Sequence, residues 1–76
     1  MNKAIRIKGI LKTKFGSTLS DEKLNQIAQV LSRLDYASRR SIENAMMSLD
    51  RVITESIDFS DTEHWIDQIV DIINND

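Results

Sequence analysis

The chain has 76 residues, a formal net charge of −2, and neither cysteine nor proline. This length allows one domain, which we expect to span residues 1–76. The lack of cysteine excludes disulfides, thiolate metal sites and cysteine nucleophiles. The longest apolar run has three residues, Ala45 to Met47, so no membrane span and no secretory signal is predicted. We therefore expect a protein of the reducing cytoplasm.

The first segment, residues 3–15, fits either a helix or a strand. As a helix it would end at Gly16 and bury a loose apolar stripe formed by Ala4, Ile7, Ile10, Leu11 and Phe15. As a strand it would separate an apolar face from a basic face formed by Arg6, Lys8, Lys12 and Lys14. Because the chain offers no second strand, a strand would require a partner chain. We favour the helix and keep the strand as the alternative.

The second segment predicts a helix over residues 19–34. Thr18 or Ser20 can cap its start, and the acidic residues Asp21 and Glu22 suit the positive end of the helix dipole. Apolar residues recur at helical spacing and form one face. That face is Leu24, Ile27, Ala28, Leu31 and Leu34.

Two further helices are predicted over residues 36–57 and 61–74. Asp35 is the expected N-cap of the first, whose apolar stripe continues without a break from Ile42 to Ile57. Ser60 and Glu63 have the spacing of a capping box at the start of the second. The apolar residues of that helix fall within an arc of roughly 160°. They are Trp65, Ile66, Ile69, Val70, Ile72 and Ile73.

These elements predict an all-α protein. We expect a small helical bundle of three long helices, preceded by a shorter N-terminal helix. The predicted core is Ile27, Leu31, Leu34, Ile42, Met46, Leu49, Ile53, Trp65, Ile69 and Ile73.

Charge is sorted along the chain. Residues 1–20 hold five basic residues and no acid, whereas residues 52–76 hold seven acids and no base. One interpretation is that the first and last segments lie side by side and attract each other. The other is that one of them docks a partner. The candidate docking residues are Arg6, Lys8 and Lys12 in the basic arm, and Glu63, Asp67 and Asp71 in an acidic ridge.

Residues that carry enzyme chemistry are few. His64 is the only histidine, and with Asp67 at i, i+3 it offers at most two metal ligands. The two isolated glycines, Gly9 and Gly16, form no phosphate-binding loop. We therefore expect no catalysis, no metal and no cofactor.

A second surface is predicted on the helix expected over residues 36–57. If that helix starts at Tyr36, then Tyr36, Arg40 and Met47 share one line. Tyrosine, arginine and methionine are enriched at the centres of protein interfaces. Because domains of this size are often supported by oligomerisation, we expect a homodimer or a permanent partner.

Two functions remain as hypotheses. The first is a non-enzymatic interaction module, an adaptor, inhibitor or regulator that binds a larger protein. The alternative is a DNA-binding transcriptional regulator with a basic N-terminal arm. The segments Leu24–Leu31 and Ser38–Ile42 resemble the core of helix-turn-helix or ribbon-helix-helix proteins. That resemblance implies a recognition helix at Ser38–Ile42, but the connection is longer than in helix-turn-helix families and lacks their turn glycine.

Overall fold

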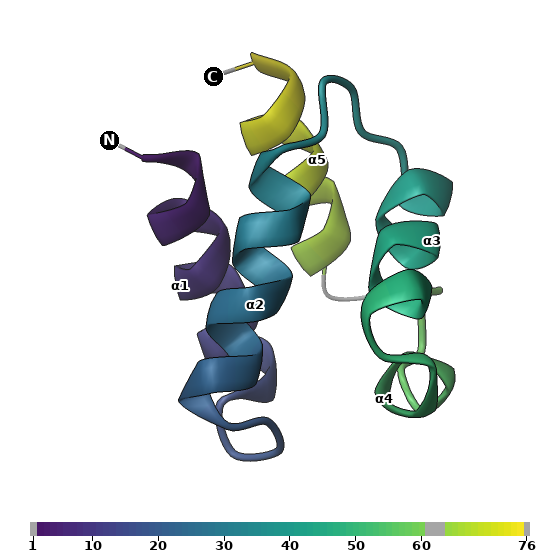
Figure 1. The fold of residues 1–76 in the computed structure, drawn as a ribbon. Coiled ribbons are helices and arrows are strands. Elements are labelled where there is room, and N and C mark those ends of the chain that lie inside the picture. Colours follow the sequence, from purple (N-terminus) through teal and green to yellow (C-terminus); the bar gives the residue numbers. More distant parts are fainter. Residues whose placement is uncertain (1, 61–63, 76) are drawn as a thin grey trace.

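The structure is a computed structural model, and it describes residues 2–60 and 64–75. Within that part the chain is all-α and contains no strand, which confirms the predicted fold class (Figure 1). The helices are α1 (Lys3–Phe15), α2 (Asp21–Ser32), α3 (Arg39–Leu49), α4 (Arg51–Glu55) and α5 (Trp65–Asn75). None of the described helices has both the length and the apolar character needed to cross a bilayer.

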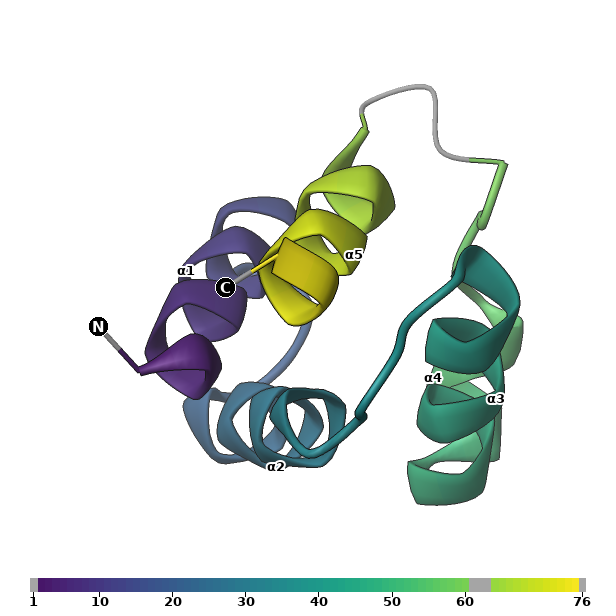
Figure 2. The ribbon, with the colours of Figure 1, turned by 90° about the horizontal axis from the view of Figure 1, so that it is seen from above.

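The helices form two groups that share one core. α1 packs against both α2 and α5, while α3 contacts α2, α4 and α5. Seen from above, α1, α2 and α5 lie together and the α3–α4 pair lies to one side (Figure 2). The first and last helices are therefore neighbours, as one interpretation of the charge pattern proposed. Lys3 of α1 donates from Nζ to the carbonyl of Ile73 in α5 over 3.0 Å.

The first segment is a helix, and the strand alternative is wrong. Its first turn is capped by Asn2, whose side-chain oxygen accepts from the Ala4 amide at 2.7 Å. Ala4, Ile7 and Leu11 are buried against the neighbouring helices. With 13 residues α1 is longer than α2, which has 12, so the prediction of a shorter N-terminal helix is also wrong. The burial of one apolar stripe between two neighbours sustains its length.

The second helix begins where the capping signal predicts. Ser20 is the N-cap, and its hydroxyl accepts from the Lys23 amide at 3.1 Å. The helix is shorter than predicted at both ends, because it runs from Asp21 to Ser32 rather than over residues 19–34. The predicted apolar face is buried except at Leu34, which lies beyond the helix and is half-buried.

The prediction of a single helix over residues 36–57 is wrong, because this segment contains two helices. α3 begins at Arg39, with Ser38 as N-cap in place of Asp35, and the helix ends at Leu49. Asp50 then has an extended backbone (φ −154°, ψ 98°) and serves as the N-cap of α4. Its carboxylate accepts from the Ile53 amide at 3.0 Å, and its carbonyl accepts from the Thr54 hydroxyl at 2.7 Å. These local bonds replace the bonds of a continuous helix.

The last helix starts at Trp65, later than the predicted boundary. The predicted capping box falls on Ser60 and Glu63, and residues 61–63 lie outside the described part of the chain. His64, directly before the helix, has a left-handed backbone with φ 64°. This conformation is uncommon for a residue with a side chain. It turns the chain sharply into α5.

Most of the predicted core residues are buried, and α1 adds further residues to the core. Seven of the ten predicted core residues are buried, and Leu34, Leu49 and Ile53 are half-buried. α1 contributes Ile7 and Leu11, which are fully shielded from solvent. The predicted core did not include them, although the helix interpretation of that segment placed both on its apolar stripe.

Candidate functional site

The predicted interface stripe does not form one line. Because α3 begins at Arg39, Tyr36 lies in the connection before the helix, where its side chain is 72% exposed. Arg40 is exposed on the first turn of α3, and Met47 is half-buried. The prediction required a helix that starts at Tyr36, and it is wrong in that respect. Tyr36 remains one of the few large apolar side chains that are strongly exposed.

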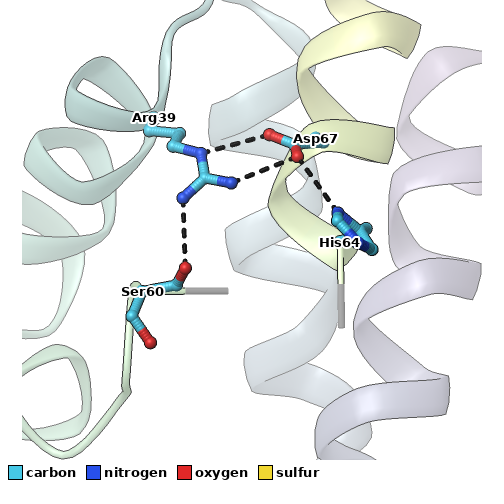
Figure 3. A network of polar contacts seen from close by, with 4 residues as sticks. All are labelled: Arg39, Ser60, His64 and Asp67. Atoms are coloured by element: carbon cyan, nitrogen blue, oxygen red, sulfur yellow. Dashed lines mark hydrogen bonds and ion pairs between the residues drawn. The ribbon is translucent and has the colours of Figure 1, made fainter. Parts of the chain in front are cut away.

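The acidic ridge is divided between a structural contact and open surface. Asp67 accepts two hydrogen bonds from Arg39 of α3, one from Nε and one from Nη2, each 3.1 Å long. Arg39 also donates from Nη1 to the carbonyl of Ser60 at 3.2 Å (Figure 3). Asp71 lies on the exposed side of α5, and Glu63 falls outside the described residues. Asp67 therefore connects α5 to the start of α3 through these hydrogen bonds.

His64 lies beside Asp67 in this network. Its Nδ1 lies 3.4 Å from the Oδ2 atom of Asp67, and both side chains are exposed (Figure 3). Hydrogen bonds from Arg39, and secondarily from His64, lower the pKa of Asp67 below its ordinary value. Among the residues that the structure describes, no three histidine or carboxylate side chains gather as metal ligands.

The Asp67 network predicts an acid-sensitive contribution to stability. Because the folded pKa of Asp67 is lowered, its contribution is present above the unfolded pKa of about 3.9 and is lost as the pH falls through the folded pKa. We expect the urea midpoint to fall as the pH is lowered from about 5. The Asp67→Asn variant should show a weaker pH dependence, measured by circular dichroism. An equal pH dependence in both proteins would exclude this contribution.

The basic arm is distributed around α1 rather than gathered on one face. Lys8 forms an ion pair of 3.0 Å with Asp21 of α2. Lys12 is exposed, and Arg6 is half-buried beside α5. The helical conformation turns Arg6 away from Lys8 and Lys12, whereas a strand would have placed all three on one face.

An open groove lies between α1 and α5 in the described structure, with a volume of about 710 Å³. α1 lines it with one helical face at positions i, i+3, i+4, i+7 and i+8, and α5 closes the other side. The lining residues are Arg6, Gly9, Ile10, Thr13 and Lys14 of α1, and Trp65, Gln68 and Ile72 of α5. Apolar side chains thus meet polar and basic ones in a single depression.

Gly9 leaves a gap in the side-chain lining of this groove. A Cβ atom built there would meet nothing within 4 Å, so the packing of the protein does not require glycine. The backbone does not require it either, because Gly9 has no positive φ. Glycine inside a helix costs about 1 kcal/mol relative to alanine. A mid-helix glycine without a folding role was the sequence signal that could have indicated the groove.

An exposed apolar residue lies beside that gap. Ile5 is one turn before Gly9 on the same face of α1, and its side chain is 63% exposed. Thr13, one turn after Gly9, directs its hydroxyl to the Gly9 carbonyl at 3.0 Å. Ile5 is not among the residues that line the groove.

The structure also bears on the two DNA-binding resemblances. Residues 3–15 form α1, so the N-terminal strand of a ribbon-helix-helix protein is not present. Residues 33–38 separate α2 from α3, and Arg39 at the start of the resembling recognition segment bonds to Asp67. That arginine faces α5 rather than an outside ligand (Figure 3).

The described part of the chain is thus a small all-α fold that carries an open, mixed-polarity depression between α1 and α5. Comparisons with protein families, with curated proteins and with solved structures give no match to this chain.

Proposed function

We propose that this protein is a non-catalytic interaction module, an adaptor, inhibitor or regulator that binds a larger protein. The observation that supports this function is the open groove between α1 and α5. It is lined by Arg6, a residue type enriched at interface hot spots, by the half-buried Ile10, and by the small exposed parts of Trp65 and Ile72. Grooves between helices are a recurring site of peptide recognition. We therefore place the binding site at this groove.

The distribution of basic residues favours a protein ligand over DNA. A duplex is held by several phosphate contacts made together. On this chain Lys8 pairs with Asp21, and Lys3 donates to the carbonyl of Ile73. The net charge of −2 also opposes association with nucleic acid. A partner that uses both apolar and charged contacts fits the groove better.

Site-specific photo-crosslinking tests this function. A photoreactive phenylalanine analogue replaces Thr13, which lines the groove, and the full chain is irradiated in native lysate after nuclease treatment. A second protein carries the analogue at Ser48, an exposed position on α3. We expect one dominant crosslinked protein from position 13 and none from position 48. Both variants should keep the helical circular-dichroism spectrum of the unmodified chain.

Three outcomes would contradict the proposal. Equal crosslinking from both positions would show that the groove is not the site. A product that forms only in a parallel lysate without nuclease treatment would support DNA binding instead. A crosslinked dimer of the chain itself would identify a homodimer in place of a larger partner.

A further inference from the structure

The short helix α4 buries a polar residue and exposes an apolar one. Thr54 is 2% exposed, whereas Val52 is 81% exposed and Ile53 is only half-buried. The hydrophobic effect normally selects the apolar residues of a helix for burial. The orientation of α4 therefore opposes its own apolar pattern.

A continuous helix through this segment would reverse that arrangement. At about 100° per residue, Ile53 would lie between Ile42 and Met46, on the apolar stripe that those two buried residues form. Thr54 would lie about 120° from Ile42, outside the stripe. Residues 39–55 contain neither proline nor glycine, so nothing in their composition prevents such a helix.

Two contacts of one carboxylate hold the break in place. Oδ1 of Asp50 accepts from the Ile53 amide at 3.0 Å, an amide that would donate to the Leu49 carbonyl in a continuous helix. Oδ2 of Asp50 lies 3.2 Å from Nζ of Lys23 in α2. A cap and a partly exposed ion pair are each modest contributions. They are opposed by the exposure of Val52, so the broken and the continuous helix lie close in free energy.

The connection to α5 is long enough for both arrangements. Residues 56–64 join α4 to α5, and nine residues can span up to about 30 Å. The longest extent of the structure is 29 Å. Redirecting a helix of five residues displaces its end by much less, because such a helix is only about 7.5 Å long.

We propose that the joint between α3 and α4 is a conformational switch with two arrangements, the described one broken at Asp50 and a second in which residues 39–55 form one helix. The carboxylate of Asp50, paired with Lys23, selects the broken arrangement. A ligand that engages Lys23 or Val52 differently in the two arrangements would shift their populations. The switch is separate from the groove, whose lining residues all belong to α1 and α5.

The Asp50→Ala variant of the full chain tests the switch by NMR. It removes the cap and the ion pair and introduces a better helix former. We expect the Cα secondary shift at position 50 to change from an extended to a helical value. Amide exchange at Val52 should slow by about tenfold or more, because that amide gains the Ser48 carbonyl as a partner.

A single introduced cysteine gives an independent measurement, because the chain has no other. Thr54→Cys places a thiol at the buried position, where alkylation by N-ethylmaleimide should be slow. Adding Asp50→Ala should speed this alkylation by about tenfold or more. Ser48→Cys is the matched control, since Ser48 is exposed on α3 and keeps its place in either arrangement. Its alkylation rate should not respond to Asp50→Ala.

The Arg51→Pro variant locks the broken arrangement. Arg51 is the first residue of α4, where proline is favoured, and the extended backbone of Asp50 is the conformation preferred before proline. Inside a continuous helix the same proline would be strongly unfavourable. Arg51→Pro should therefore keep the circular-dichroism spectrum of the unmodified chain, the extended shift at position 50 and the protection of a cysteine at position 54.

Four results would overturn the proposal. An extended shift at position 50 in Asp50→Ala would show that the break does not need the carboxylate. A coil shift there, with fast alkylation at position 54, would show that α4 only unfolds without its cap. Loss of the fold in Arg51→Pro would also contradict it. If Asp50→Ala does not fold, Lys23→Gln removes the ion pair alone and should move the shift at position 50 toward the helical value. An unchanged shift in that variant is the fourth result.

Discussion

Replacing Trp65 with alanine should remove a large part of the stability of this protein. The Trp65 side chain is 4% exposed at the start of α5. Its ring meets that of Phe15 edge-on, with centroids 5.0 Å apart, and that of Phe59 at 6.0 Å. It thereby joins the end of α1, the segment before α5, and α5 itself. Truncating a buried tryptophan to alanine costs about 3–5 kcal/mol.

A domain of this length has a total stability of roughly 4–11 kcal/mol, so the loss is a large part of the whole. We expect the melting temperature of Trp65→Ala to fall by about 15 °C or more, measured by the helical circular-dichroism signal. Trp65→Phe preserves an aromatic ring beside Phe15 and Phe59 and should lose much less. An alanine variant that melts within about 5 °C of the unmodified chain would contradict the central role of this cluster.

The Asn74→Ala substitution should also destabilise the protein, although Asn74 has an exposed position on α5. Its side chain accepts from the amide of Ala37 at 2.7 Å and donates to the carbonyl of Ala37 at 2.8 Å. Ala37 is 1% exposed, so both of its backbone groups depend on this amide. Loss of such a partner leaves polar groups unsatisfied, and we expect a cost of about 2 kcal/mol.

The next residue provides a matched control for this experiment. Asn75 lies beside Asn74 in the last turn of α5, and its side chain bonds to Asp71 at 2.7 Å on the exposed surface. Asn75→Ala should therefore change the urea midpoint very little. Asn74→Asp should be damaging as well, because a carboxylate cannot donate to the Ala37 carbonyl. Equal midpoints for Asn74→Ala and Asn75→Ala would show that the contact with Ala37 adds no stability.

The helical class and much of the core were predictable from local patterns. The Ser20 cap and the spacing of Leu24, Ile27 and Leu31 are local signals, and the structure contains the helix that they predict. The apolar arc of α5 was also predicted from the sequence, and five of its six members are buried in the structure. For α1, the absence of any second strand favoured the helix over the strand.

The interruption of the helix at Asp50 could not be predicted from the apolar pattern. The apolar period continues through Leu49 and Ile53, and neither proline nor glycine interrupts it. Asp50 nevertheless ends one helix and caps the next, and Lys23 of α2 forms an ion pair with it at 3.2 Å. Aspartate is compatible both with a helix interior and with a cap. The bond to the Ile53 amide and the contact with α2 favour the cap.

The candidate site was only partly accessible from sequence. Arg6 belongs to the predicted basic arm and lines the groove, and Lys12 lies exposed on the same helix. Trp65 was assigned to the core, which it occupies while also lining the groove. The sequence analysis considered Gly9 only as an isolated glycine that forms no phosphate-binding loop. Its place in the lining of the groove becomes visible only when α5 lies beside α1.

Composition and periodicity by themselves determined that this chain has no disulfide and that its described part is all-α. These properties depend on residue types and on neighbours a few positions apart. Only the tertiary structure determined which residues that are far apart in the sequence contact each other. Arg39 meets Asp67 across 28 positions, Asn74 meets Ala37 across 37, and the groove joins two helices from opposite ends. Such pairings depend on how the helices pack. The sequence pattern alone does not determine this packing, because helix faces with similar apolar patterns can pack in several ways.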